Sequence, residues 1–251
     1  MTAFSALTRA SYKANTRDTV TIFFTFAFPL IFLVIFGLIF RGQRVEETGN
    51  GYIDFIAPGV LAWGLANAAA FGVAFSLMQW RRDDLLRLIR LTPARLSEVV
   101  LARLIIAACI GISQCVLFIG VATIPLFGMR VSARWPLALP VMLLGIATFL
   151  GVGLIIGAVS KTPEAVSAIG NCVVIPMAFL SGAFIPVELM PDWLVTVSYF
   201  MPLRYVLDGL VYALAGAGDA GDYWISCGAL VAFATVFTAI GLRLFRWDDE
   251  G

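Results

Sequence analysis

Six stretches of the sequence contain no Asp, Glu, Lys or Arg over 20 to 26 residues each. An α-helix needs about 20 mostly apolar residues to cross the hydrocarbon core of a bilayer, so each stretch is long enough to span it. The first stretch is too long for the apolar part of a signal peptide, and no small-residue cleavage site follows it. We therefore predict six transmembrane helices, at residues 19–40, 55–80, 99–129 (around the uncharged stretch that begins at Leu104), 135–160, 165–187 and 223–242.

The composition agrees with a membrane protein. Of the 251 residues 61% are hydrophobic and only 13% are charged, and the mean hydropathy is +0.94. A soluble domain of this length would need a larger charged surface. Histidine is absent, which removes histidine-based acid–base chemistry and histidine metal ligands. We expect an all-α membrane protein with no metal site and no cofactor bound by this chain.

The basic residues predict the orientation of the six helices. If the helices alternate across the membrane, twelve Lys and Arg residues fall on one side and five on the other, and the richer side is normally cytoplasmic. Both termini are then cytoplasmic. The twelve are Arg9, Lys13, Arg17, Arg81, Arg82, Arg87, Arg90, Arg95, Arg103, Lys161, Arg243 and Arg246, and the five are Arg41, Arg44, Arg130, Arg134 and Arg204.

One charged segment, WRRDDLLRLIRLTPARL at residues 80–96, interrupts the apolar chain between the second and third predicted spans. It cannot itself span the membrane, because each arginine at the bilayer centre costs about 2.5–3.5 kcal/mol on insertion scales. At helical spacing Leu85, Leu86 and Ile89 share one face, which predicts a short amphipathic helix at 81–91. Such a helix either lies on anionic headgroups or docks on a partner protein. The residues alone leave these two interpretations even.

Two further segments are predicted to lie at the membrane without crossing it. Residues 1–17 carry a basic residue at every fourth position opposite apolar ones, which is typical of an interfacial elbow helix. Residues 188–218, between the fifth and sixth spans, contain two uncharged runs of 11 and 10 residues, which are too short to cross. We expect a pair of re-entrant helices there, with any irregular backbone shielded by protein.

The segment FLSGAFIPVELMPDWLVTVSYFMPLRYVLDGL at 179–210 resembles the signature of ABC-2 type ABC transporter permeases, the membrane subunits of bacterial drug, lipid and glycan exporters of the daunorubicin-resistance type. The charged segment at 81–103 resembles the first cytoplasmic loop of the same family, and the six-span layout agrees with it. The positions that match the signature are Ser181, Gly182, Pro186, Pro191, Pro202 and Tyr205.

The resemblance implies a half-transporter in a bacterial cytoplasmic membrane, in contact with membrane lipid. It implies a second permease copy or paralogue and two separate ATP-binding subunits, which would hold ATP and Mg²⁺, and it implies no nucleic-acid partner. The residues agree on one point. A phosphate-binding loop needs a glycine-rich turn before its lysine, and neither Lys13 nor Lys161 has one. The chain is therefore not expected to be an enzyme by itself.

In the family the loop helix sits in a groove of the ATPase, which shifts the balance for 81–91 towards partner binding. An apolar anchor with a charged rim is the usual anatomy of such an interface. The short loop 160–165 is a smaller candidate contact, where Thr162, Pro163 and Glu164 in the first turn favour a plain helix start. The residues expected to couple the chain to the ATPase are Arg81, Arg82, Asp83, Asp84, Leu85, Leu86, Ile89 and Glu164.

The family's cargo path lies between two permeases and is lined by the second and fifth spans. Each of these helices presents one face with an amide among apolar side chains, and a buried amide needs a partner, which either a path or a helix contact supplies. Close packing within one subunit is the interpretation of Gly153-x-x-x-Gly157. The residues predicted to line the path are Asn67, Phe71, Phe75, Met78, Asn171, Ile175 and Phe179.

The resemblance implies export driven by the partner ATPase, and the apolar faces rich in Phe and Met favour a hydrophobic or amphipathic drug or antibiotic as the cargo. A lipid or lipid-linked glycan exporter of the same family is the alternative. A secondary transporter is a further alternative, but it usually needs ionisable residues within its spans. Only Asp54, at a span edge, and Asp208, in the re-entrant segment, could serve it.

Overall fold

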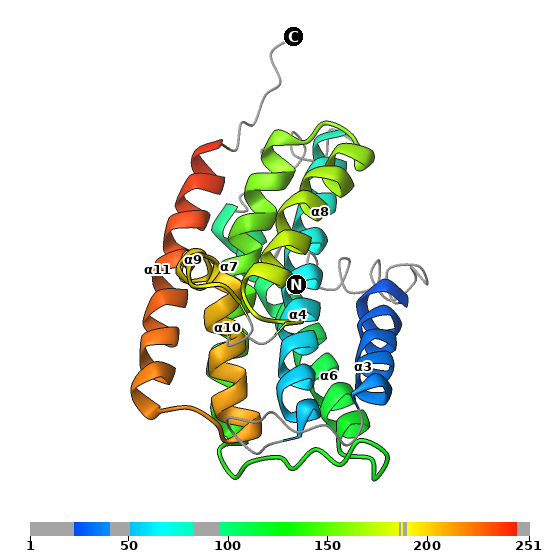
Figure 1. Ribbon diagram of the computed structural model, residues 1–251. Helices are drawn as coiled ribbons and strands as arrows, with labels where there is room; N and C mark the ends of the chain where they lie inside the picture. Colours follow the sequence, from blue (N-terminus) through cyan, green and yellow to red (C-terminus); the bar gives the residue numbers. More distant parts are fainter. Residues whose placement is uncertain (1–22, 41–50, 83–95, 186, 188–189, 245–251) are drawn as a thin grey trace.

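The computed structural model describes residues 23–40, 51–82, 96–185, 187 and 190–244, which form helices and connecting turns with no β-strand among them (Figure 1). The predicted elbow helix at 1–17 and residues 83–91 of the predicted amphipathic helix lie outside this range. The elements are η1 (Phe23–Ala27), α3 (Phe28–Ile39), α4 (Tyr52–Arg82), α6 (Leu96–Ala122), η2 (Trp135–Leu137), α7 (Ala138–Val159), α8 (Pro163–Leu180), α9 (Asp192–Ser198), α10 (Pro202–Leu210), η4 (Val211–Ala215) and α11 (Ala220–Leu244).

Five of the described helices are long and apolar enough to cross a membrane: α4, α6, α7 with η2, α8 and α11. The first predicted span corresponds to a shorter apolar helix, Thr25–Ile39, in the described part of the chain. Two shorter segments, α9 and the continuous α10–η4, lie between α8 and α11. They are long and apolar enough to cross a membrane only when counted together, and the chain bends by 91° between them. The predicted all-helical membrane fold, with a pair of short helices before the last span, is confirmed.

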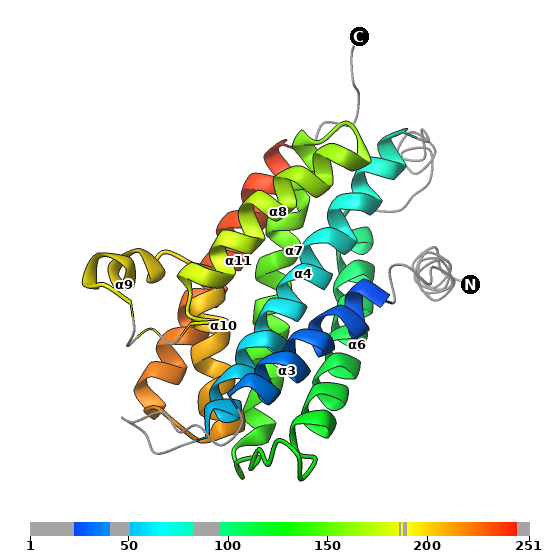
Figure 2. The same cartoon turned by 45° about the vertical axis from the view of Figure 1, so that its right-hand side comes forward.

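Helices α4 and α7 run in the same direction and end side by side. We call this end of the bundle the Arg81 end, and α8 starts there too. The opposite end, which we call the Arg134 end, holds the α6–α7 loop and the start of α11. A hydrogen bond joins α11 to η2 at this end, because the Tyr223 hydroxyl donates to the Leu137 carbonyl at 3.0 Å. Figure 2 shows α3 crossing α4 on one face of the bundle, while α9 projects sideways from it.

Helix α7 is packed between α4 and α11 through glycines. A Cβ added at Gly153 would lie 2.3 Å from the Ala70 carbonyl oxygen of α4, and one at Gly157 would lie 3.0 Å from that of Ala74. On the other side, Gly151 of α7 faces α11 at Phe237. In lipid, helices associate by close packing rather than by a hydrophobic driving force, so residues without side chains bring backbones together. The predicted close packing at Gly153 and Gly157 within one subunit is confirmed.

The first apolar helix starts irregularly, and a side chain of α6 supplies a hydrogen bond that the backbone of this helix lacks. Pro29 has no N–H, so it cannot donate to the Thr25 carbonyl four residues earlier, and residues Phe23–Ala27 form a π-helix. The fully buried Gln114 of α6 donates from Nε2 to this Thr25 carbonyl at 2.6 Å. The side chain of Gln114 thus ties α6 to the first helix across Gly64, where a Cβ would lie 3.5 Å from Gln114 Nε2.

Helix α8 ends earlier than predicted. The uncharged stretch continues to Val187, but the helix stops at Leu180 and residues 181–184 form a buried turn. The prediction of a helix to residue 187 is therefore wrong. Its physical reason is that the turn lies inside the protein, where an apolar sequence is needed even without a helix.

Candidate functional site

Arg81 closes the last turn of α4 and its side chain points to α7. Both terminal nitrogens of its guanidinium donate to the Ala158 carbonyl at 3.1 Å, and Nη2 also donates to the Gly157 carbonyl at 3.3 Å. The sequence suggested that this side chain touches a partner protein. In the chain itself it joins the ends of two spans.

The short connection from α7 to α8 lies beside Arg81. Ser160 is buried and its hydroxyl has no partner among the described residues. The Thr162 hydroxyl accepts from the Ala165 N–H at 3.2 Å, and Pro163 is the first residue of α8. The expected helix start at 160–165 is confirmed, including the position of Glu164 in its first turn. Glu164 is exposed and within electrostatic range of Arg82.

The other residues expected to contact an ATPase, Asp83, Asp84, Leu85, Leu86 and Ile89, lie outside the described residues. Arg82 and Glu164 are exposed at the Arg81 end. The structure thus brings the ends of both loops predicted to meet a partner to the same place, and contact with that partner remains a prediction.

Of the predicted path residues of α4, Met78 is buried, while Asn67, Phe71 and Phe75 are half-buried. Phe71 packs on α8, where a Cβ at Gly170 would lie 2.4 Å from the Phe71 ring. Phe71 and Phe75 stack with ring centroids 6.0 Å apart, and Met78 is buried. The Asn67 side chain donates to the Trp63 carbonyl one turn earlier at 2.9 Å, so its amide is partly satisfied within its own helix.

The predicted path residues of α8 lie on an open face of that helix. Asn171, Ile175 and Phe179 are all exposed, and Phe179 contacts the chain through the Phe184 ring, 5.3 Å away. The two predicted faces therefore do not line one channel inside a single chain. Phe71 of the α4 face packs against α8, and the face of α8 is left open.

The turn after α8 explains the Ser-Gly part of the signature. The buried Ser181 donates from both its N–H and its hydroxyl to the Met177 carbonyl. Gly182 has a φ of +91°, a conformation that a residue with a side chain rarely adopts. The turn then inserts between α3 and α4, where the Ala183 carbonyl oxygen would lie 2.1 Å from a Cβ at Gly59. Because the turn is buried, the protein shields its irregular backbone, as irregular backbone within a membrane requires.

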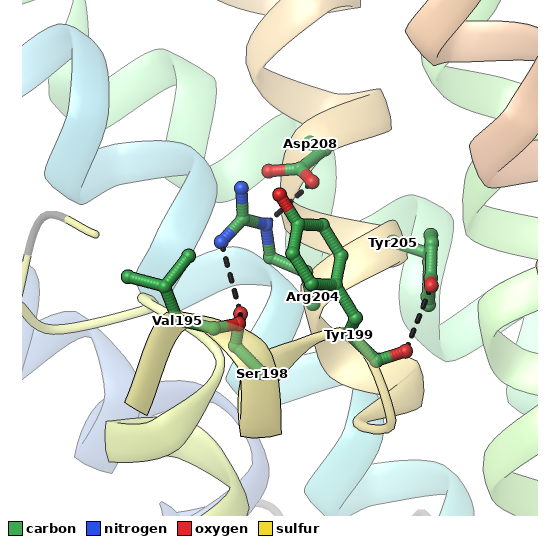
Figure 3. Close-up of polar contacts among 6 residues, drawn as sticks. All are labelled: Val195, Ser198, Tyr199, Arg204, Tyr205 and Asp208. Atoms are coloured by element: carbon green, nitrogen blue, oxygen red, sulfur yellow. Dashed lines mark hydrogen bonds and ion pairs between the residues drawn. The ribbon is translucent and has the colours of Figure 1, made fainter. Parts of the chain in front are cut away.

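The proline and tyrosine positions of the signature shape the bend between α9 and α10. Pro191 precedes α9, and Pro202 is the first residue of α10, where its missing N–H costs no helical hydrogen bond. The Tyr205 hydroxyl donates to the Tyr199 carbonyl at the end of α9, at 2.8 Å (Figure 3). Pro186 lies outside the described residues.

Arg204 adds a second clamp at this bend. Its Nε donates to the Asp208 carboxylate at 2.6 Å, its Nη1 donates to the Ser198 hydroxyl at 3.2 Å, and its guanidinium lies 5.6 Å from the centre of the Tyr199 ring (Figure 3). Asp208, which a secondary transporter would have to use, is thus an ion-pair partner. Asp54 accepts from the Gly51 N–H at 3.1 Å at the start of α4.

We expect Tyr205→Phe to weaken the hold of α10 on α9 by about 1 kcal/mol, the usual net value of one hydrogen bond. Hydrogen exchange of the α9 amides should become faster, with the rest of the bundle unchanged. Tyr212→Phe is the matched control. The Arg134 guanidinium lies 4.6 Å from the centre of the Tyr212 ring, and the phenylalanine variant keeps this ring. Equal exchange of α9 in both variants would show that the Tyr205 hydroxyl does not hold the bend.

Several important contacts were not predicted from the sequence. Gly59, Gln114 and the inward direction of Arg81 have no local signal, because each depends on a residue at least 50 positions away. The Arg204–Asp208 pair did carry a signal. Opposite charges four residues apart on a helix face one another, and both residues lie in the segment predicted to form re-entrant helices.

Comparison with known proteins places the chain in a family. The family described as ABC-2 type transporter matches residues 2–215. The inner membrane transport permease YadH of Escherichia coli strain K12 is 26% identical over 86% of this chain and 83% of its own length. The daunorubicin resistance permease DrrB1 of Streptomyces coeruleorubidus is 27% identical over 87% and 77%. The linearmycin resistance permease LnrN of Bacillus subtilis is 34% identical over 39% of this chain and 26% of its own length. The chain therefore belongs to the ABC-2 type transporter family.

Proposed function

We propose that this transporter permease exports a hydrophobic or amphipathic compound, driven by ATP that a separate ATP-binding subunit hydrolyses. The observation that carries the proposal is the family match over residues 2–215. The cargo class rests on two relatives named for resistance to daunorubicin and linearmycin. The chain is the transport subunit and performs no catalysis itself.

The Arg81 end is the proposed docking side for two ATP-binding subunits, one for each permease in the complex. Two features support this. The amphipathic pattern of Leu85, Leu86 and Ile89 follows directly on α4, and the loop with Glu164 lies beside the end of that helix. Neither Lys13 nor Lys161 follows a glycine-rich phosphate loop in the sequence, so we assign ATP and Mg²⁺ to the partner.

The Arg81 end is also the proposed cytoplasmic side of a bacterial inner membrane. Arg81, Arg82, Lys161 and Arg243 lie at this end of the described bundle. Cytoplasmic loops are enriched in Lys and Arg, which supports the assignment. Both termini are cytoplasmic in this orientation.

The open face of α8 is proposed to meet a second permease copy or a paralogue, with the cargo path between them. Asn171 is exposed on a span, where a polar amide facing lipid has no hydrogen-bond partner. Ile175 is 42% and Phe179 48% exposed beside it. A second chain or a cargo would cover this face, and Phe71 and Phe75 would support it from α4.

We expect the combined change Leu85→Asp and Leu86→Asp to release the ATP-binding subunit. An apolar anchor in an interface contributes about 2 kcal/mol or more, so co-purification should fall about tenfold or more. The measurement is the amount of ATP-binding subunit recovered with the tagged permease after gentle solubilisation. Leu91→Asp is the matched control, because helical spacing puts Leu91 opposite Leu85 and Leu86.

Retention of the ATP-binding subunit by the double variant would show that the coupling assignment is wrong. If no such subunit accompanies the unmodified chain and export follows a proton gradient instead, the ATP-driven function is wrong. A lipid or lipid-linked glycan as cargo would keep the mechanism and change only the substrate class.

A further inference from the structure

The guanidinium of Arg81 occupies the end of a helix to which it does not belong. The last four carbonyl groups of a helix lack intrahelical partners, and the helix dipole makes that end negative. α7 ends at Val159, so Gly157 and Ala158 supply two of these carbonyls, and both accept hydrogen bonds from Arg81. A forked, permanently charged donor is well suited to hold two carbonyls together.

The contact lies where three helices can be moved together. Arg81 is the last residue but one of α4. Only Ser160, Lys161 and Thr162 separate the end of α7 from the start of α8, and Ser160 is buried. A shift of the α4 end that keeps these hydrogen bonds must therefore move the α7 end, and with it the start of α8.

Helices α4 and α7 are in addition locked in register just before this point. A Cβ at Gly157 would lie 3.0 Å from both the Ala74 carbonyl oxygen and the Leu77 Cβ. The two helices thus approach backbone to backbone at Ala74, two turns before Arg81, and are still in contact at the Leu77 side chain, one turn before it. The guanidinium continues this connection past the last close backbone contact, to the loop before α8.

We propose that Arg81 is a positioning residue that makes the end of α4 and the α7–α8 loop move as one unit. The proposal rests on the proposed function, because the movement would come from an ATP-binding subunit that acts on the residues after Arg81. Arg81 passes the displacement to α8, which carries the open face with Asn171. It acts through the carbonyls of its own chain, not through contact with the partner.

The test follows the α7–α8 loop during the nucleotide cycle. In the complex with its ATP-binding subunit, a Lys161→Cys variant is labelled with a sulfonated maleimide, with and without Mg-ATP and vanadate. The native cysteines, Cys109, Cys115, Cys172 and Cys227, lie within candidate spans, away from such a charged reagent. Arg81→Gln and Arg81→Lys are compared in this background, and Arg243→Gln serves as control for the loss of a positive charge at the same end.

We expect vanadate trapping to change the labelling rate of the Lys161→Cys variant with Arg81 intact, and equally when Arg243→Gln is added. In Arg81→Gln the complex should still form, while the change should shrink about tenfold, as expected when the three hydrogen bonds from a charged donor to two carbonyls are lost. Arg81→Lys keeps the charge but not the fork, so its change should be intermediate, and it decides the question if Arg81→Gln folds poorly.

An undiminished change in labelling in Arg81→Gln, or in a stable Arg81→Lys, would reduce Arg81 to a helix cap and overturn the inference. Failure of the Arg81 protein itself to bind an ATP-binding subunit would instead overturn the proposed function. The two failures are distinguishable, because the second is seen before any change is made at Arg81.

Discussion

Gly59→Ala is expected to destabilise the folded permease by on the order of 3 kcal/mol, the upper end of the usual cost of overfilling a packed interior. The added methyl would lie 2.1 Å from the Ala183 carbonyl oxygen and 3.0 Å from its carbon. Backbone atoms cannot rotate away as a flexible side chain can. The clash must therefore separate α4 from the turn that follows α8.

The turn has little freedom to yield. The Ala183 N–H donates to the Ala178 carbonyl at 3.1 Å, and the Ser181 N–H and hydroxyl donate hydrogen bonds to the Met177 carbonyl. The next residue, Phe184, lies in an aromatic cluster with its ring 5.3 Å from Trp63 and 5.9 Å from Phe32. Moving Ala183 would disturb both the hydrogen bonds and the cluster.

The measurement for Gly59→Ala is the thermal unfolding of the purified protein in detergent, with Gly72→Ala as matched control. Gly72 is in the same helix, is exposed, and has nothing within 4 Å of an added Cβ. Alanine is favoured over glycine inside a helix by about 0.5–1 kcal/mol, so the control should be neutral or slightly more stable. Equal melting temperatures for Gly59→Ala and Gly72→Ala would contradict the predicted backbone contact.

The spans could be predicted from the sequence because the membrane imposes a simple length requirement. The uncharged stretch at 135–160 corresponds closely to η2 and α7, and the one at 55–80 lies within α4, Tyr52–Arg82. The requirement fails where apolar residues are needed for another reason. Residues 181–185 extend an uncharged stretch but lie beyond the end of α8 at Leu180, in a turn that contains Gly182 with a φ of +91°.

The candidate site could be predicted only in part. The sequence places Arg81 beside a predicted coupling helix, but its hydrogen bonds reach residues 76 and 77 positions away, which no local pattern reveals. The faces of α4 and α8 were predicted from helical spacing. Which face turns inward depends on the neighbours, and for α8 those neighbours leave Asn171 exposed.

The signature residues gain an explanation from the structure. Ser181 and Gly182 build the buried turn, and Tyr205 holds the bend that follows it. The described positions of the signature thus lie in two places, the buried turn that follows α8 and the 91° bend between α9 and α10. The sequence alone identified these residues as a motif without showing what they do.

Gly153→Ala is expected to have the second large effect, at the contact between α4 and α7. Its methyl would lie 2.3 Å from the Ala70 carbonyl oxygen and 3.0 Å from the Ala70 Cα, so the two helices must separate or slide. We expect a loss of about 2–3 kcal/mol in the free energy of unfolding. Gly157→Ala should cost less, because its closest contacts are at 3.0 Å.

The nature of the obstacle gives this prediction a sharp test. Because the clash is with the backbone of Ala70 and not with its side chain, Ala70→Gly should fail to rescue Gly153→Ala in thermal unfolding. Gly228→Ala in α11, where an added Cβ meets nothing within 4 Å, is the control for glycine replacement in a span. Rescue by Ala70→Gly would show that side chains, not backbones, limit the approach. Loss of the close approach should also draw Gly157 and Ala158 away from Arg81, so Gly153→Ala should weaken the nucleotide-dependent change in the α7–α8 loop as well.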